Sequence, residues 1–148
     1  MGDNPPALPA PPSLPEIEVA AGLAFRAGRL LIAQRRPGNH LGGLWEFPGG
    51  KRRAGETFET CLQRELREEL GIEVEVIELI EALTHIYPEK TVHLRFYRCR
   101  WIRGEPRALG CDAWAWVTRA GLNQYRFPPA DERLLERLGR DSALWEPS

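Results

Sequence analysis

The hydrophobic residues of this 148-residue chain follow two different spacings. Strict alternation of apolar and polar residues, or a short apolar run between turn residues, is typical of β-strands. Apolar residues three and four positions apart are typical of one face of a helix. The strand patterns lie at residues 17–25, 30–34, 44–47, 73–85, 92–101 and 113–117, and the helical patterns at residues 58–70 and 132–138. This order predicts an α/β fold, an α/β/α sandwich in which helices enclose a mixed β-sheet.

Glycine, proline and small polar residues mark the ends of the two predicted helices. Thr57 is suited to cap the N-terminus of the first helix, and Gly71 is suited to end it in a left-handed conformation. Pro128 and Pro129 precede the second helix, where proline is tolerated, and Gly139 is expected to end it.

The composition predicts a single domain preceded by a tail. Residues 1–15 are rich in proline and cannot contribute a core, so we expect a disordered tail followed by one domain at residues 16–148. The net charge of −1 gives no general attraction for a nucleic acid polymer or an acidic membrane. Neither an apolar run of membrane-spanning length nor a secretory signal is visible.

The chain has three cysteines, an odd number, without the CxxC spacing of a zinc site. This favours a reducing compartment over a disulfide-bonded secreted protein. We therefore expect a cytoplasmic protein, and the residues leave open whether it is a monomer or a homodimer.

Three glutamates share one narrow face of the first predicted helix. Because a helix turns by about 100° per residue, Glu68 and Glu69 lie within about 60° of Glu65 on either side. The apolar stripe, which includes Leu62 and Leu66, overlaps this arc. Carboxylates crowded on a partly buried face repel one another unless they are paired or bind a cation, and a divalent cation with oxygen ligands meets that need. The alternative is an ordinary solvated helix rich in glutamate and arginine.

A glycine turn and a polar loop precede this helix. Gly50 is followed after five residues by Glu56, and after seven more by the run Arg64-Glu65-Leu66-Arg67-Glu68-Glu69-Leu70-Gly71-Ile72. This spacing resembles the Nudix box at each defined position. The stretches QRRPGNHLGGLWEFPGGK and FPPADERLL look like the MutT branch of the Nudix hydrolases, whose members hydrolyse nucleoside triphosphates, notably oxidised guanine nucleotides. The resemblance extends from Ile17 to Leu138 and implies the Nudix fold.

The resemblance also implies roles for the residues of the box. The implied catalytic residues are Glu56, Arg64, Glu65, Glu68 and Glu69. The backbone carbonyl of Gly50 and the last three of these glutamates are implied to bind Mg²⁺ or Mn²⁺. Glu56 and Arg64 are implied to hold the loop and the helix together.

The implied reaction is attack of water at the β-phosphorus of a nucleoside triphosphate, which gives a nucleoside monophosphate and pyrophosphate. Arg35 matches an arginine that approaches the nucleotide in MutT-like proteins, and Lys51 is placed to meet a phosphate. No activated serine or cysteine is apparent, and metal-assisted phosphoryl transfer does not need one. With 8-oxo-dGTP as substrate, such an enzyme sanitises the nucleotide pool and contributes to DNA repair.

The chain departs from the MutT pattern at two positions. Gly110 replaces a MutT glutamate that serves the metal or the water, which leaves Asp112 or a glutamate of the box as candidate general base. Asp131 stands where MutT has an asparagine that reads the base, and an ionised aspartate only accepts hydrogen bonds. We expect Asp131 to contact oxidised guanine or the amino group of cytosine, or else to be only a first-turn helix residue.

Two further functions are consistent with these residues. A CTP or 5-methyl-dCTP pyrophosphohydrolase keeps the mechanism and changes the base. A non-catalytic Nudix-fold binding module, similar to the C-terminal domain of the MutY adenine glycosylase, binds a damaged base without hydrolysis. Such modules tend to lose the box carboxylates, whereas this chain keeps all four, which favours an enzyme.

Overall fold

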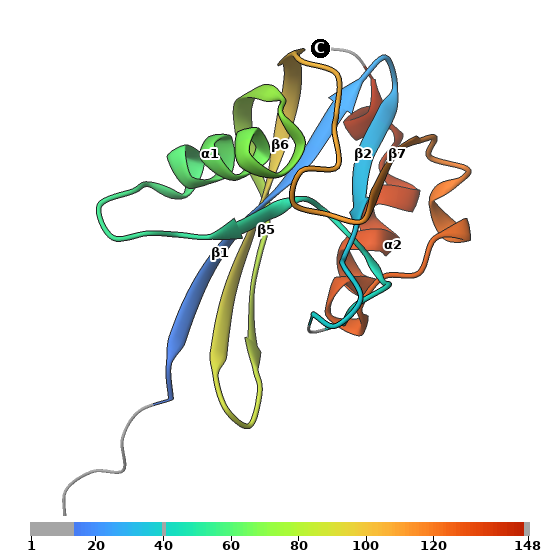
Figure 1. The fold of residues 1–148 in the computed structure, drawn as a ribbon. Helices are drawn as coiled ribbons and strands as arrows, with labels where there is room; N and C mark the ends of the chain where they lie inside the picture. Colours follow the sequence, from blue (N-terminus) through green and yellow to red (C-terminus); the bar gives the residue numbers. More distant parts are fainter. Residues whose placement is uncertain (1–13, 40, 147–148) are drawn as a thin grey trace, which may run out of the picture.

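A computed structural model of the chain describes residues 14–39 and 41–146, so nearly all of the predicted tail at residues 1–15 lies outside the described residues. Seven strands form one sheet (Figure 1). Their bounds are β1 Glu16–Arg26, β2 Arg29–Gln34, β3 Trp45–Glu46, β4 Gly49–Lys51, β5 Glu73–Ile86, β6 Thr91–Arg103 and β7 Ala113–Val117. The α-helices are α1 Phe58–Leu70 and α2 Glu132–Arg140, and short 3-10 turns lie at Leu122–Gln124, Pro129–Asp131 and Ser142–Trp145. No helix in the described ranges is long and apolar enough to cross a membrane.

The parallel pair of β1 and β6 forms the middle of the sheet. Their register runs from Glu16 opposite Thr91 to Phe25 opposite Arg100. β5 joins β6 as an antiparallel hairpin, β2 joins β1, and both β3 and β7 pair with β2. The sheet is therefore mixed, as predicted.

β1 changes its antiparallel partner along its length. Phe25 and Arg26 pair with β2, whereas Val19–Ala21 pair with β4. Between the two partners, the carbonyl of Pro48 accepts a hydrogen bond of 2.8 Å from the amide of Gly22. The edge of β1 that faces away from β6 is therefore divided between two partners, β2 and β4. The candidate site lies beside the point where one partner gives way to the other.

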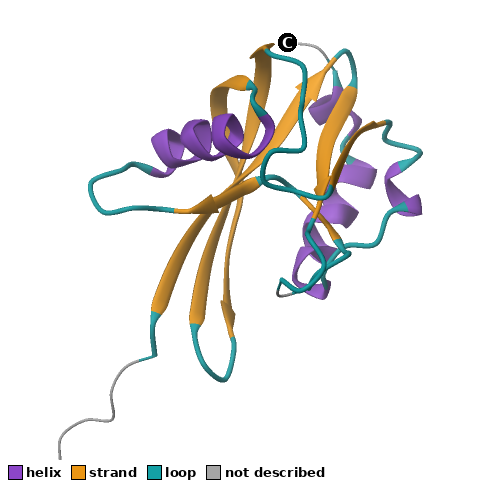
Figure 2. Ribbon diagram, viewed as in Figure 1, coloured by secondary structure: helices purple, strands orange, loops and turns teal. Residues whose placement is uncertain are grey.

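Helices cover both faces of the sheet (Figure 2). One apolar cluster includes Leu62 and Leu66 of α1 and Tyr97 of β6. The other includes Leu134 and Leu138 of α2 and the neighbouring β6 residue, Phe96. Successive residues of a strand point to opposite faces, so β6 serves both clusters. The predicted α/β/α arrangement is confirmed.

The predicted ends of α1 are also confirmed, whereas one end of α2 is wrong. The hydroxyl of Thr57 accepts a hydrogen bond from the amide of Thr60, and Gly71 has a φ of 68°. Gly139 does not end α2, because the helix continues to Arg140. Glycine lowers helix propensity without forbidding the helical backbone, so a single glycine near a helix end is a weak stop.

The 3-10 turn at Ser142–Trp145 closes the α2 side of the core and was not predicted from the sequence. The Trp145 side chain is buried and its indole N–H donates a hydrogen bond of 2.9 Å to the carbonyl of Leu138. Its ring meets that of Phe25 edge to face, with centroids 5.3 Å apart. This segment therefore stabilises the end of the sheet remote from the β5–β6 turn.

We predict that Trp145→Ala lowers the free energy of unfolding by about 3–5 kcal/mol, because it leaves a large cavity and an unpaired carbonyl. Trp114→Ala is the matched control, since Trp114 is 36% exposed, and it should cost less than about 1 kcal/mol. Urea denaturation followed by circular dichroism measures both. Equal losses in the two variants would contradict the role of Trp145 as a core residue.

Candidate active site

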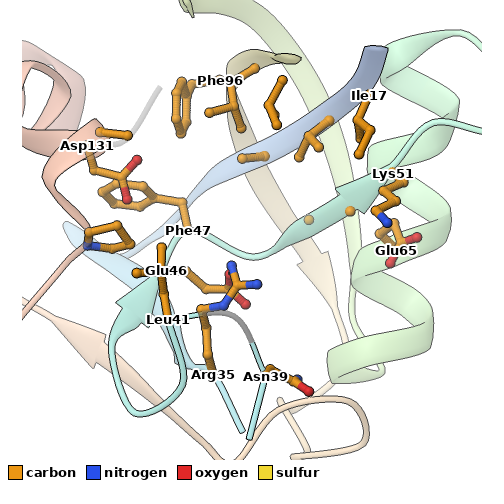
Figure 3. Close-up of a pocket in the computed structure, with 18 of the residues that line it drawn as sticks. Ile17, Arg35, Asn39, Leu41, Glu46, Phe47, Lys51, Glu65, Phe96 and Asp131 are labelled. Carbon is orange, nitrogen blue, oxygen red and sulfur yellow. The ribbon is translucent and has the colours of Figure 1, made fainter. Parts of the chain in front are cut away.

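A cavity of about 440 Å³ lies beside the divided edge of β1 (Figure 3). Alternate residues of the central parallel strands form an apolar floor, because positions two apart on a strand face the same side. The floor residues are Ile17, Val19 and Ala21 of β1 and Val92, Leu94 and Phe96 of β6. Such a floor suits a flat apolar group, with polar groups at its margins to orient it.

At one end of the cavity, Gly50 lies against the carboxyl group of Glu65. A β-carbon at position 50 would be 2.3 Å from Cδ of Glu65 and 2.5–2.6 Å from its oxygens, so any larger residue would displace the Glu65 carboxyl group from this position. Lys51 and Glu69 line the same end. The structure thus brings together four of the residues that the sequence analysis selected.

Arg64 connects the loop, β4 and α1. Its Nε donates to Oε2 of Glu56 at 2.6 Å and one terminal nitrogen to Oε1 at 2.9 Å, which is a bidentate pair. The same guanidinium donates to Oε1 of Glu65 at 2.8 Å and to the carbonyl of Lys51 at 3.1 Å. The hydrogen bonds from Arg64 lower the pKa of Glu56 to about 2. Arg64 therefore holds Glu56 ionised and Glu65 in place.

Glu69 is a partly buried carboxylate with other carboxylates nearby, and these surroundings disfavour its ionised form. Burial, together with the carboxylates of Glu46 and Glu65, raises the pKa of Glu69 to about 8, although Arg35 acts in the opposite direction. Burial together with negative neighbours makes the ionised form costly. A cation at this end of the cavity would relieve that cost.

Glu68 lies differently from the other two glutamates of the face. Its side chain is 50% exposed and pairs with Arg64 at 3.2 Å and with Arg53 at 4.0 Å. It does not line the cavity, whereas Glu65 and Glu69 do. The shared helical face therefore brings two of the three carboxylates into the cavity, because the flanking arginines draw the third outward.

A partly buried ion pair lies in the cavity wall. A terminal nitrogen of Arg35 lies 2.8 Å from Oε2 of Glu46. The Nε of Arg35 is buried and has no hydrogen-bond partner among the described residues. Burial raises the pKa of Glu46, and Arg35 partly offsets this. A buried donor without a partner, at a cavity wall, is suited to an acceptor group of a ligand.

Asp131 lies at the other end, directly before α2. It is 8% exposed and is the single buried charged residue among those described. Burial, together with the carboxylate of Glu46, raises the pKa of Asp131 to about 6, although Arg35 acts in the opposite direction. Its side chain does not cap α2, and Figure 3 shows it across the cavity from Glu65. The structure therefore places Asp131 where a ligand would meet it.

Several cavity residues were not selected as site residues from the sequence, among them Glu46, Tyr87 and Lys90. A glutamate within the apolar stretch Leu44–Phe47 was a usable signal for Glu46. Tyr87 and Lys90 lie in the β5–β6 turn, which looks like an ordinary turn in the sequence. They reach the cavity only because β6 runs parallel to β1, a pairing that no local pattern reveals.

Gly110 lines the cavity, whereas Asp112 does not. The amides of Leu109 and Gly110 both donate to the carbonyl of Glu69, each at 3.0 Å. A β-carbon at position 110 would be 3.0 Å from Cγ and 3.2 Å from Cα of Glu69, so the loop packs closely on the helix. Asp112 is exposed. The structure does not bring this candidate general base to the site.

The donors at the acidic end fit a hard divalent cation. Glu65 and Glu69 supply carboxylate oxygens, the ligands that such cations prefer, and positive charge would offset the repulsion around Glu69. In the described part of the chain, no three acidic, histidine or cysteine side chains already converge as ligands of one ion. The remaining ligands would therefore be backbone, substrate or water oxygens.

The NUDIX domain family matches residues 20–137 of the chain. The chain belongs to this family, the Nudix hydrolases, which confirms the resemblance found in the sequence. It is 41% identical to the 8-oxo-dGTP diphosphatase of Haemophilus influenzae over 124 residues, which is 82% of this chain and 90% of the relative.

Two Escherichia coli relatives are also similar to the chain. It is 38% identical to the CTP pyrophosphohydrolase, over 81% of this chain and 89% of the relative. The solution structure of the ORF135 protein matches with a TM-score of 0.71 and 36% identity, over 83% of this chain and 88% of the other. The relatives are thus named for purine and for pyrimidine nucleotides.

We predict that Glu69→Gln stabilises the metal-free protein at about pH 9 by roughly 2 kcal/mol. The raised pKa of Glu69 means that the folded state keeps a proton that the unfolded state loses above about pH 4.5. The stability of the wild type therefore falls as pH rises to about 8, and the advantage of the variant should vanish near pH 5.

Denaturant titrations in a chelator at both pH values measure this difference. Glu68→Gln is the matched control, because Glu68 is half exposed, and it should change stability by less than about 1 kcal/mol. If Glu69→Gln were no more stable than the wild type at the higher pH, the conclusion that ionised Glu69 destabilises the metal-free protein would be wrong.

Proposed function

We propose that this protein is a metal-dependent nucleoside triphosphate pyrophosphohydrolase that acts on oxidised guanine nucleotides such as 8-oxo-dGTP. The observation that carries the proposal is one continuous cavity with carboxylates at one end, an apolar floor, and Asp131 at the other end. A nucleotide has the matching order of phosphates, sugar and base. The similarity to the 8-oxo-dGTP diphosphatase of H. influenzae supports the choice of substrate.

Mg²⁺ or Mn²⁺ would be held by the backbone carbonyl of Gly50 and by the carboxylates of Glu65 and Glu69. Glu68 would assist from the rim of the cavity. Bound at this end, the ion would neutralise phosphate charge and polarise the attacking water. Arg64 keeps Glu65 in position and compensates its charge. Glu56 acts indirectly, because its ionised carboxylate fixes Arg64.

Positively charged side chains would orient the substrate. Lys51 lines the acidic end and offers an ammonium group to the phosphates, and Arg35 offers its unpartnered Nε–H from the cavity wall. Phosphoryl substitution depends mainly on positioning and charge stabilisation. Attack at the β-phosphorus would release a nucleoside monophosphate and pyrophosphate.

The apolar floor and the ring of Phe47 would receive the base, and Asp131 would contact its polar edge. An ionised carboxylate accepts hydrogen bonds, and a protonated one also donates. 8-Oxoguanine presents an N7–H donor to the ionised form, whereas guanine presents a lone pair there. This difference favours the oxidised base at neutral pH.

A cytosine nucleotide is the second candidate substrate. The amino group of cytosine is a donor that an ionised Asp131 can accept, and the chain is 38% identical to the CTP pyrophosphohydrolase of E. coli. The mechanism is the same for both bases. The described cysteines are free and buried, in accord with a reducing compartment, and we propose that the enzyme acts on free nucleotides in the cytoplasm.

The first experiment is pyrophosphate release with Mg²⁺ from 8-oxo-dGTP, dGTP, CTP and 5-methyl-dCTP. We expect kcat/KM for 8-oxo-dGTP to exceed that for dGTP by about 100-fold or more, since a site built around a hydrogen bond rejects the analogue that lacks it. A cytosine preference would select the second candidate. Tight nucleotide binding with no turnover of any substrate would refute an enzyme and indicate a binding module.

We predict that Glu69→Gln lowers kcat about 100-fold or more, because it removes a charge that binds the cation. Glu59→Gln is the control on the same helix, since Glu59 is exposed in the first turn of α1, and it should retain wild-type activity. Circular dichroism confirms that both variants are folded. Turnover of Glu69→Gln at the wild-type rate would remove the proposed role of the helix carboxylates.

We predict that the preference for 8-oxo-dGTP over dGTP falls as pH is lowered through about 6, the pKa of Asp131 in the folded protein. Protonation turns the carboxylate into a partial donor, which no longer discriminates between N7–H and a lone pair. Asp131→Asn, whose amide does not titrate, should show a preference that does not change with pH. The ratio of kcat/KM values between about pH 5 and 8 measures this, and a pH-independent ratio in the wild type would contradict it.

A further inference from the structure

β5 carries an irregularity beside the cavity floor. Leu79 pairs with Tyr97 of β6, and the next pair is Glu81 with Phe96, so Ile80 is an additional residue without a partner on β6. Such a bulge bends the strand and releases backbone groups from the ladder. Phe96 is both the neighbour of the bulge and a floor residue of the cavity.

Arg137 of α2 binds the backbone carbonyl that the bulge releases from the ladder. One of its terminal nitrogens donates a hydrogen bond to the carbonyl of Ile80 and a longer one, of 3.4 Å, to Oε2 of Glu81. Glu81 is well buried, with its side chain 13% exposed. Arg133 also pairs with Glu81, at 3.5 Å, but its side chain is 84% exposed. Arg137 is therefore the inner attachment of α2 to the bulge.

The same helix begins directly after Asp131, and Asp131 precedes Arg137 by six residues. On the other side of Asp131, the ring of Phe127 stacks on that of Phe47, with centroids 5.0 Å apart. Asp131 thus lies between an aromatic contact and the Arg137 attachment.

Among the other polar contacts of α2, Arg133 binds Glu81 from the exposed side, and Arg119 donates to the carbonyl of Gly139 near the end of the helix, at 3.0 and 2.6 Å. The packing of the buried face of α2 on the sheet is apolar and non-directional.

We propose that Arg137 is a positioning residue for base selection: by holding α2 at the β5 bulge, it fixes the distance between the Asp131 carboxyl group and the cavity floor at Phe96. This inference rests on the proposed contact between Asp131 and the base. A hydrogen-bonding group displaced by about 1 Å loses much of its discrimination, so a residue outside the cavity affects substrate choice. Arg137 touches no substrate atom, and the chemistry at α1 does not depend on it.

Arg137→Met tests the proposal, because methionine keeps an apolar stem and removes the donors. We expect the kcat/KM ratio of the preferred to the disfavoured nucleotide to fall by about fivefold or more, mainly through a higher KM for the preferred one, with kcat within about twofold. Arg137→Lys should restore part of the ratio. Arg133→Met is the control, because Arg133 pairs with the same Glu81 from the exposed side, and this variant should leave the kcat/KM ratio unchanged. A merely structural role would lower the folded fraction and reduce activity equally for all nucleotides.

A double-mutant cycle with Asp131→Ala separates this inference from the proposed function, because alanine removes the hydrogen-bonding group. An unchanged ratio in Asp131→Ala would refute the base contact and everything that rests on it. A changed ratio in Asp131→Ala with a wild-type ratio in Arg137→Met would refute the positioning role alone. Non-additive effects in the double variant support the coupling, and additive effects overturn it. If Arg137→Met does not fold, Glu81→Gln weakens the same attachment and must shift the ratio in the same direction.

Discussion

The guanidinium group of Arg64 is the point at which three separate parts of the chain are joined. It binds the loop through Glu56, the strand β4 through the carbonyl of Lys51, and its own helix through Glu65. These bonds are directional and most of them are charge-assisted, so β4 cannot move relative to α1 without breaking several at once. The close approach of Gly50 to Glu65 depends on this arrangement. Without it, the acidic end of the cavity would have no fixed geometry.

Most of the catalytic helix was predictable because its determinants are local. The cap at Thr57, the left-handed Gly71 and the spacing of the box residues all lie within about two dozen positions of one another. The direction of Glu68 was not predictable, since helical geometry alone groups it with Glu65 and Glu69. Pairing with Arg64 and Arg53 decides its place instead.

The rest of the cavity was harder to predict because it is assembled from distant segments. β4 has the sequence Gly-Gly-Lys, which carries no apolar period, and only its pairing with β1 makes it a strand. Lys90 enters the cavity through the parallel register of β1 and β6. Asp131 was selected from a resemblance, yet its burial and raised pKa follow from contacts that the sequence does not display.

The two apolar clusters of the protein share the strands β1, β2, β5 and β6 but no α-helix. α1 therefore belongs to one core and α2 to the other. The cavity lies beside the divided edge of β1 and is lined by residues from both sides of the sheet. As a result, the core that supports Asp131 can be repacked while the frame around Arg64 stays intact. A lineage with this architecture can exchange one base for another through changes on one face of the sheet. The relatives named for 8-oxo-dGTP and for CTP show that one family includes both.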